Sequence, residues 1–197
     1  GGMRFSLKAE AALAGEIHRI CQAFSGARKK CLVLDLDNTL WGGIAGEDGP
    51  NGIELNSIGP GARFRDFQQV LRQMKCSGVL LAVVSKNNPA DVLEIIRAHS
   101  QMVLREADFV SLKINWNPKH ENLLEMARDL NLGIDSFVFV DDNPAERESV
   151  RQLLPGVTVP DFPQDTTLLA KFGMELFQEY FQALRVTEED RKKTELY

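Results

Sequence analysis

The stretch Cys31-Leu-Val-Leu-Asp-Leu-Asp-Asn-Thr-Leu40 decides the fold, because a short apolar run ends abruptly in two carboxylates separated by one residue and followed by a hydroxyl. An extended strand end sends Asp35 and Asp37 in one general direction and turns Leu36 back to the core. Two like charges this close repel each other, and a divalent cation relieves the repulsion. An exposed polar turn would give the same Asp-x-Asp pattern, so the rest of the chain must decide between the two interpretations.

The composition predicts one ordinary globular domain. The chain has 197 residues, of which 44% are hydrophobic and 26% charged, as in a typical soluble protein. A net charge of −5 provides no electrostatic footprint for nucleic acid or an anionic membrane. We find no membrane-spanning apolar run and no signal peptide. Cys21, Cys31 and Cys76 form no disulfide framework or metal pair, which predicts a cytoplasmic protein whose cysteines are buried as small apolar residues.

Strands and helices are expected to alternate along the chain, which predicts a parallel sheet with right-handed crossovers. The expected strands lie at about 31–35, 79–84, 109–114, 137–140 and 157–159, and the expected helices at about 8–24, 61–76, 89–99, 118–131 and 144–154. Polar clusters follow these strands. The carboxyl edge of an open α/β sheet is where such folds build their sites.

Residues 40–60 are rich in glycine and contain two prolines. This composition predicts a glycine-hinged flap or hairpin over the end of the first strand. Trp41, together with Gly42 and Gly43, either forms a hydrophobic lid that excludes water from the site or simply packs a turn.

Four chemical signals follow one another in order: the Asp-x-Asp pair, Ser85 after the second strand, Lys119 at a helix start, and Asp141-Asp142 after another strand. Phosphoryl transfer to a carboxylate needs a cation and a lysine to neutralise the phosphoryl oxygens. Hydroxyls and backbone N–H groups at helix starts bind the same oxygens. The plain alternatives are a solvated Lys119 and a helix-capping turn at the Asp-Asp-Asn-Pro run of residues 141–144. Ser85 is expected to cap the following helix in addition to binding phosphate.

The order and spacing of these signals resemble the haloacid dehalogenase (HAD) superfamily of magnesium-dependent phosphoryl-transfer enzymes. The resemblance implies that Asp35 is the nucleophile and Asp37 the general acid/base. It implies Mg²⁺ held by Asp35, the backbone carbonyl of Asp37 and the Asp141-Asp142 pair, with Asp142 favoured. Phosphate or substrate binding is implied for Leu36, Asn38, Thr39, Trp41, Gly42, Gly43, Ser85, Lys86, Asn87 and Lys119. The implied fold is a Rossmann-like three-layer α/β/α domain with a five-stranded, mostly parallel sheet in the order 5-4-1-2-3 and a small flap after strand one.

A narrower resemblance, to the FkbH-like family, is carried by residues 35–43, 84–88, 139–146 and 187–197. It implies an enzyme that takes a phosphorylated three-carbon metabolite such as 1,3-bisphosphoglycerate and removes phosphate. The glyceryl or related unit is then loaded onto the phosphopantetheine arm of an acyl carrier protein in polyketide synthesis. Many members have Cys immediately before the serine of the second motif, where this chain has Val84. An acyl-enzyme at that position is therefore excluded, which favours direct transfer to the carrier thiol, a route requiring another domain, or a variant substrate.

Two other functions stay open at this stage, a stand-alone phosphatase of sugar phosphates or phosphoproteins and an inactive module that only docks a carrier protein. We expect residues 1–28 to be a tag remnant and a helix, 29–184 the catalytic domain, and 185–197 a charged tail leading to another domain of a larger synthase. Arg63 and Arg65, or Lys86, are the expected docking cations for an acidic carrier.

Overall fold

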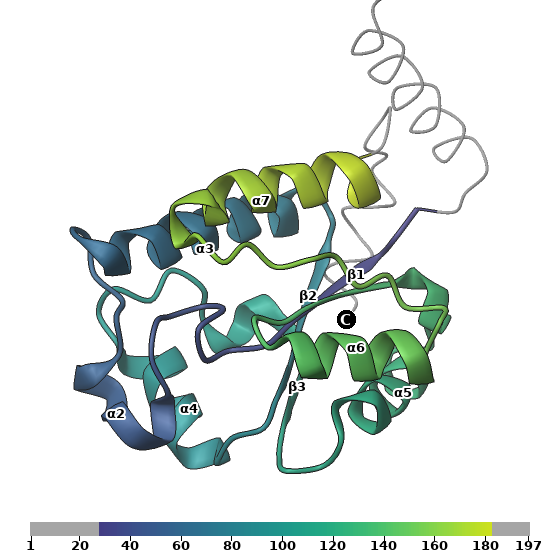
Figure 1. Cartoon of the computed structure of the whole chain (residues 1–197), viewed down its shortest axis with the longest axis horizontal. Helices are drawn as coiled ribbons and strands as arrows, with labels where there is room; N and C mark the ends of the chain where they lie inside the picture. Colours follow the sequence, from purple (N-terminus) through teal and green to yellow (C-terminus); the bar gives the residue numbers. More distant parts are fainter. Residues whose placement is uncertain (1–27, 183–197) are drawn as a thin grey trace, which may run out of the picture.

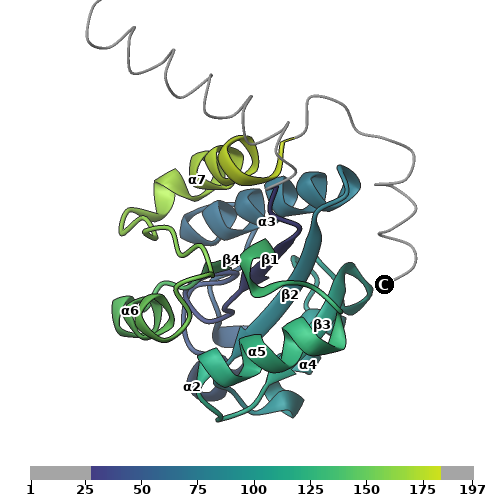
Figure 2. The ribbon, with the colours of Figure 1, turned by 90° about the vertical axis from the view of Figure 1, so that its right-hand side faces the viewer.

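The computed structural model describes residues 28–182, which form a parallel sheet between two layers of helices (Figures 1 and 2). The strands are β1 (Cys31–Leu34), β2 (Leu80–Ser85), β3 (Phe109–Ile114) and β4 (Phe137–Val140), in the order β3-β2-β1-β4. The three-layer α/β/α prediction is therefore confirmed. The expected opening helix, Cys21 and the charged tail lie outside the described residues.

The helices cover the two faces of the sheet in separate groups, and each group closes its own apolar cluster. The first group comprises α3 (Pro60–Cys76), α4 (Pro89–Ala98) and α7 (Leu169–Leu176), and the second comprises α5 (Lys119–Asp129) and α6 (Pro144–Leu153). Along β1, Leu32 and Leu34 enter the first cluster, whereas Cys31 and Val33 enter the second. A strand buried on both faces reads as a continuous apolar run, which is why these strands were visible in the sequence. No helix in the described part of the chain is long and apolar enough to cross a membrane.

The path of the chain places a topological switch point beside β1. From β1 the chain passes through α3 to β2 and through α4 to β3, always on the same face. It then crosses to the other face through α5, and β4 pairs in parallel with the free edge of β1. Ligand sites of open α/β sheets form where the strand order reverses in this way, here between the carboxyl ends of β1 and β4.

The prediction of a fifth strand at 157–159 is wrong. Thr158 makes only an isolated parallel bridge to Val138, with one hydrogen bond of 2.9 Å and one of 3.1 Å to the neighbouring β4 backbone. Pro155 and Pro160 flank this segment. Proline has no N–H to donate to a ladder, so the pairing ends within a few residues.

The segment between β1 and α3 is not the expected hairpin. Gly42 and Glu54 exchange two backbone hydrogen bonds of 3.1 and 2.8 Å, and between them the chain forms the irregular helix α2 (Ala45–Gly52). The Asp48 carboxylate accepts a hydrogen bond of 2.8 Å from the Ile44 backbone N–H at the start of this helix. An acidic side chain in the first turn favours helix over hairpin. The action of this segment as a flap stays a prediction.

Helix α7 was not predicted from the sequence, and it lies beside α3 in both views. Phe172 of α7 packs on Phe67 of α3, with ring centroids 6.3 Å apart. A Cβ on Gly173 would lie 2.9 Å from Val70 Cγ1, so the two helices approach closely at this glycine. Cys76, at the end of α3, is exposed, which corrects its expected burial, whereas Cys31 is buried as expected.

Replacing Gly43 with alanine should destabilise the fold by about 1–2 kcal/mol. Gly43 has a φ of 92°, and a Cβ there would lie 2.5 Å from Asp48 Oδ2. This oxygen accepts the hydrogen bond from the Ile44 N–H at the start of α2. The free energy of unfolding from urea denaturation measures the effect. Gly46→Ala is the matched control, since no atom lies within 4 Å of a Cβ at this position and alanine favours helix. Equal stability of the two variants would contradict this explanation of the Gly-Gly pair.

Candidate active site

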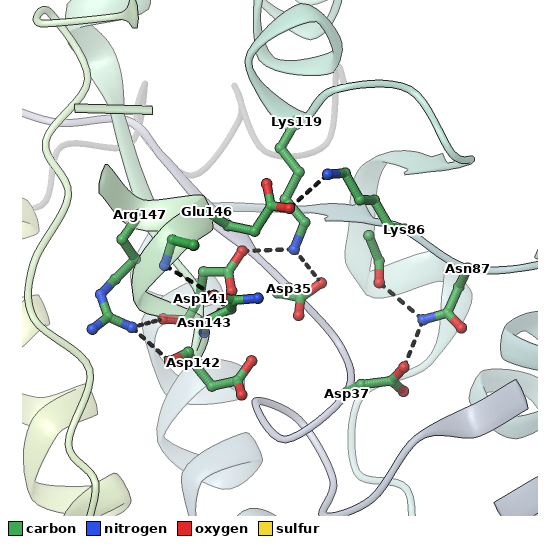
Figure 3. A network of polar contacts seen from close by, with 12 residues as sticks. Asp35, Asp37, Lys86, Asn87, Lys119, Asp141, Asp142, Asn143, Glu146 and Arg147 are labelled. Atoms are coloured by element: carbon green, nitrogen blue, oxygen red, sulfur yellow. Dashed lines mark hydrogen bonds and ion pairs between the residues drawn. The ribbon is translucent and has the colours of Figure 1, made fainter. Parts of the chain in front are cut away.

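The carboxyl ends of β1 and β4 bring three of the four predicted carboxylates together (Figure 3). The Asp35 backbone N–H donates to the carbonyl of Val140 at 2.9 Å, which extends the β1–β4 pairing by one residue. Asp35 therefore lies beside Asp141, the first residue after β4. One ligand atom from each of Asp35, Asp141 and Asp142 lies within 4.8 Å of the others.

Lys119 joins two of these carboxylates. Its Nζ lies 2.6 Å from Asp141 Oδ2 and 2.9 Å from Asp35 Oδ1. The residue is only 4% exposed, which rules out the solvated alternative. Lys119 is the first residue of α5, and a reciprocal pair of amide hydrogen bonds between Asn115 and Asn122 ties this helix to the preceding loop.

The charges of this cluster do not balance. Burial is the main cause that raises the pKa of Asp35 to about 7; Lys119 opposes this shift and Asp141 adds to it. Burial and the neighbouring Asp141 also raise the pKa of Asp142. Burial acts to lower the pKa of Lys119, but the two paired carboxylates outweigh it and the pKa is raised. One ammonium thus serves three carboxylates, and negative charge is left in excess.

The donor set fits a divalent cation. Hard carboxylate oxygens are the ligands that Mg²⁺ prefers. In Asp141 both oxygens are engaged, Oδ2 by Lys119 and Oδ1 by the Asn143 backbone N–H at 2.9 Å. Asp35 uses only one oxygen, Oδ1, in its ion pair with Lys119, so the residues best placed to offer oxygens to a metal are Asp35 and Asp142. Within residues 28–182, no other group of three or more potential metal ligands occurs.

Two residues after β4 fix this part of the site, of which Asn143 belongs to the predicted capping turn and Arg147 had no predicted role. Arg147 Nη1 donates to the carbonyls of Asp141 and Asp142 at 2.8 and 2.7 Å. Asn143 caps α6 through a 2.9 Å hydrogen bond from the Ala145 N–H. The run of residues 141–144 therefore does cap a helix, through Asn143, while its two aspartates belong to the carboxylate cluster. An Asn-Pro helix start is the sequence signal for this cap.

Asp37 stands apart from the three carboxylates. Its Oδ1 accepts hydrogen bonds from Trp41 Nε1 at 2.9 Å and from the Ala45 backbone N–H at 3.0 Å. Its Oδ2 accepts one from Asn87 Nδ2 at 2.9 Å. Metal binding by its backbone carbonyl stays a prediction.

Most of the residues predicted to bind substrate after β1 shape a turn, and their part in substrate binding stays a prediction. Leu36, Thr39 and Trp41 are fully buried, so Trp41 packs within the turn and is not an exposed lid. The N–H groups of Thr39 and Leu40 both bond to the Leu36 carbonyl, closing one helical turn. Asn38 has a φ of 54°, a left-handed conformation that asparagine tolerates.

The Asn38 carboxamide also accepts a 2.9 Å hydrogen bond from the Gly43 N–H. Gly42 leaves no room for a side chain, because a Cβ there would lie 2.9 Å from Glu54 Cβ. The Trp-Gly-Gly sequence is therefore explained by packing and turn geometry.

The residues after β2 form the other side of the site. Ser85 is buried, and its Oγ accepts a 3.1 Å hydrogen bond from Asn87 Nδ2. The additional role expected for Ser85, as a helix cap, is wrong, because Asn88 occupies the N-cap position of α4. Lys86 Nζ donates to Glu146 Oε1 of α6 at 2.6 Å, so this expected docking cation is already engaged. Arg63 likewise donates to Thr166 Oγ1 at 2.8 Å. Carrier docking by these cations stays a prediction.

Comparison with known proteins places the fold. No protein-family model matches the chain, and no curated protein matches it significantly. Among solved structures it is similar to the N-terminal part of the protein BF1531 from Bacteroides fragilis, which contains a phosphatase domain and is complexed with Mg. The TM-score is 0.85 at 39% identity over 92% of this chain and 48% of that one. The chain thus spans about half the length of that structure.

More distant structures agree on the architecture. A predicted HAD-like family hydrolase from Porphyromonas gingivalis aligns with a TM-score of 0.50 at 15% identity, covering 76% of this chain and 98% of that one. An uncharacterized protein from Corynebacterium glutamicum aligns with a TM-score of 0.51 at 13% identity, covering 77% and 94%. The chain shares its α/β fold with these structures, and at these low identities the likeness concerns the fold alone.

Mg²⁺ should stabilise the protein against thermal unfolding, and Asp142→Asn should abolish most of this effect. A ligand at a hundredfold excess over its dissociation constant adds about 2.7 kcal/mol. Removing one of three crowded carboxylates should also leave the metal-free variant at least as stable as wild type. Melting temperatures with and without MgCl₂ test both points. Asp66→Asn, an exposed site on α3, is the control that should keep the full response. An equal response of the Asp142→Asn variant would remove Asp142 from the metal site.

Proposed function

We propose that this chain is a magnesium-dependent phosphotransfer enzyme of the HAD type. The observation that carries the proposal is the cluster of Asp35, Asp141, Asp142 and Lys119 at the switch point of a parallel sheet. A carboxylate can attack a phosphoryl group only where cations neutralise its equatorial oxygens. The cluster combines that carboxylate, a buried ammonium and a donor set that fits Mg²⁺.

In the proposed reaction, the Asp35 carboxylate attacks phosphorus and the bond to the leaving oxygen breaks. Asp37 gives the leaving oxygen a proton, and phosphate is left as an acyl phosphate on Asp35. Water then attacks this phosphorus, Asp37 takes a proton from the water, and Asp35 is regenerated with release of inorganic phosphate. Lys119 holds Asp35 in place, and the Ser85 hydroxyl can donate to a phosphoryl oxygen. Mg²⁺, when bound, supplies neutralising charge to the phosphoryl oxygens.

We further propose that the substrate is a phosphorylated three-carbon acid with an acyl phosphate, and that the acceptor is the phosphopantetheine thiol of an acyl carrier protein. The thiol sulfur attacks the acyl carbon, the bond from that carbon to the phosphate oxygen breaks, and phosphate leaves with the thiol proton as the thioester forms. The second phosphate is then removed at Asp35 by the steps given above. This finer proposal rests on the FkbH-like resemblance and on the rim of the site. Trp116 is 66% exposed, and its Nε1 donates to Asn88 Oδ1 at 3.2 Å, directly after the residues that follow β2. Exposed tryptophans are enriched in protein interfaces. A protein acceptor explains such a side chain better than a small metabolite does.

A second candidate is a stand-alone phosphatase of sugar phosphates or phosphoproteins. The likeness to the N-terminal part of BF1531, which contains a phosphatase domain, favours it. A stand-alone phosphatase would use the same chemistry at Asp35. It would differ from the first candidate because no carrier thiol accepts an acyl group, and water is the only acceptor. The two candidates are therefore separated by the fate of the three-carbon unit.

Asp35→Asn should lower Mg²⁺-dependent release of phosphate by about 10³-fold or more while the protein stays folded. The amide cannot act as the nucleophile, yet it has nearly the shape of the carboxylate and relieves the crowding with Asp141. Inorganic phosphate released from acyl and alkyl phosphates measures the activity, with Asp66→Asn as the control. Activity close to that of wild type would reject Asp35 as the nucleophile.

Incubation with a holo acyl carrier protein, 1,3-bisphosphoglycerate and Mg²⁺ should increase the carrier's mass by a glyceryl unit, measured by intact-mass spectrometry. Trp116→Ala should slow this loading while leaving hydrolysis of p-nitrophenyl phosphate unchanged. Phosphate release without any change in carrier mass, for every carrier offered, would favour the stand-alone phosphatase. Loading by the Trp116→Ala variant at the wild-type rate would reject the rim as the docking surface.

A further inference from the structure

Asp37 is held by donors from two separate parts of the chain, and Figure 3 shows its contact with Asn87. Trp41 and Ala45 follow β1 and both donate to its Oδ1. Asn87 follows β2 and donates to its Oδ2. We propose that Trp41 and Asn87 are positioning residues that orient Asp37 for proton transfer to the leaving oxygen. This inference rests on the proposed phosphotransfer function, in which Asp37 is the acid/base.

The Trp41 side chain is a rigid donor. The whole residue is 0% exposed, so the ring is fixed by its surroundings. An indole N–H can only donate a hydrogen bond, so it always demands an acceptor at Asp37 Oδ1. An isolated backbone bridge between Asp37 and Trp41 keeps the two residues in this relation.

Asn87 connects Asp37 to the predicted phosphate-binding hydroxyl. The same Nδ2 donates to Asp37 Oδ2 at 2.9 Å and to Ser85 Oγ at 3.1 Å. Asn87 is itself buried, and a buried amide that loses a partner is destabilised by roughly 1–3 kcal/mol. Its orientation is therefore fixed, and Asp37 and Ser85 are held in a constant relation across the ends of two strands.

The pattern of donors leaves one defined place for a proton. A carboxylate has about four lone-pair positions, two on each oxygen. At Asp37 two donors reach Oδ1 and one reaches Oδ2. The remaining lone pair belongs to Oδ2, the oxygen that Asn87 positions. We infer that the transferred proton resides on Oδ2.

The dependence on the leaving group tests this role. A leaving alkoxide needs a proton, whereas p-nitrophenolate leaves without one. Because kcat/KM reports the phosphoryl transfer to Asp35, Trp41→Phe should lower it for glycerol phosphate by about 10²-fold, within the usual range of general acid catalysis. For p-nitrophenyl phosphate the loss should be less than about tenfold. Asn87→Ala should change the ratio of the two kcat/KM values in the same direction.

The design separates positioning from loss of structure. Both substrates are measured on one preparation, so the ratio does not depend on the folded fraction. Asn51→Ala, at an exposed position of α2, should leave the ratio unchanged. An equal loss on both substrates, or no loss, would overturn the positioning role while the wild-type activity still supports the proposed function. A wild-type protein inactive on acyl and aryl phosphates would overturn the proposed function itself.

A second measurement examines the contact without catalysis. The chain has two tryptophans, so its spectrum contains two indole N–H resonances. Asp37→Ala should shift the ¹⁵N–¹H resonance of Trp41 and speed its exchange with solvent. The resonance of Trp116 serves as the internal control and should stay in place. An unmoved Trp41 resonance would overturn the proposed clamp on Asp37.

Discussion

The buried ammonium of Lys119 is the interaction on which the site depends. It links the first residue after β1, the first residue after β4 and the start of α5. A buried lysine without partners would lose several kcal/mol of hydration energy, and breaking one partner of a buried pair is strongly destabilising. Lys119 and its two carboxylates can therefore be buried only together. Because the three charged groups stabilise one another, they hold the carboxyl ends of β1 and β4 and the start of α5 close together.

The same cluster explains why metal and phosphate chemistry belong together here. One ammonium among three carboxylates leaves a negative excess that would repel a phosphoryl group. A divalent cation reverses the sign of the local charge and makes the approach of a phosphate favourable. Asp142, which is only partly buried, contributes a carboxylate where a cation can enter from solvent. The sequence provides this residue because two aspartates, Asp141 and Asp142, follow β4 directly.

The sequence predicts the four strands and the helices between them because their apolar residues follow simple periods and their ends carry Pro, Asn or Asp. It also predicts that Asp35, Lys119 and the Asp141-Asp142 pair meet, since parallel strands end at one edge. The sequence did not predict the features that depend on tertiary contacts. Helix α7 owes its place to contacts with α3, and Trp41 is buried by the turn that it closes. The contacts of Asn87 with Asp37 and Ser85 join two loops and leave no local pattern.

The strand order also has a consequence for self-association. β3 lies at the edge of the sheet, and in the described residues it pairs only with β2. An open edge is a template on which another chain can add a strand and begin aggregation. Here the edge strand carries Lys113, whose Nζ is held by Glu125 and Asp129 of α5 at 2.8 and 2.7 Å. A strand that added to β3 would have to displace or bury this charged group. The ion pairs of Lys113 therefore disfavour pairing of β3 with another chain.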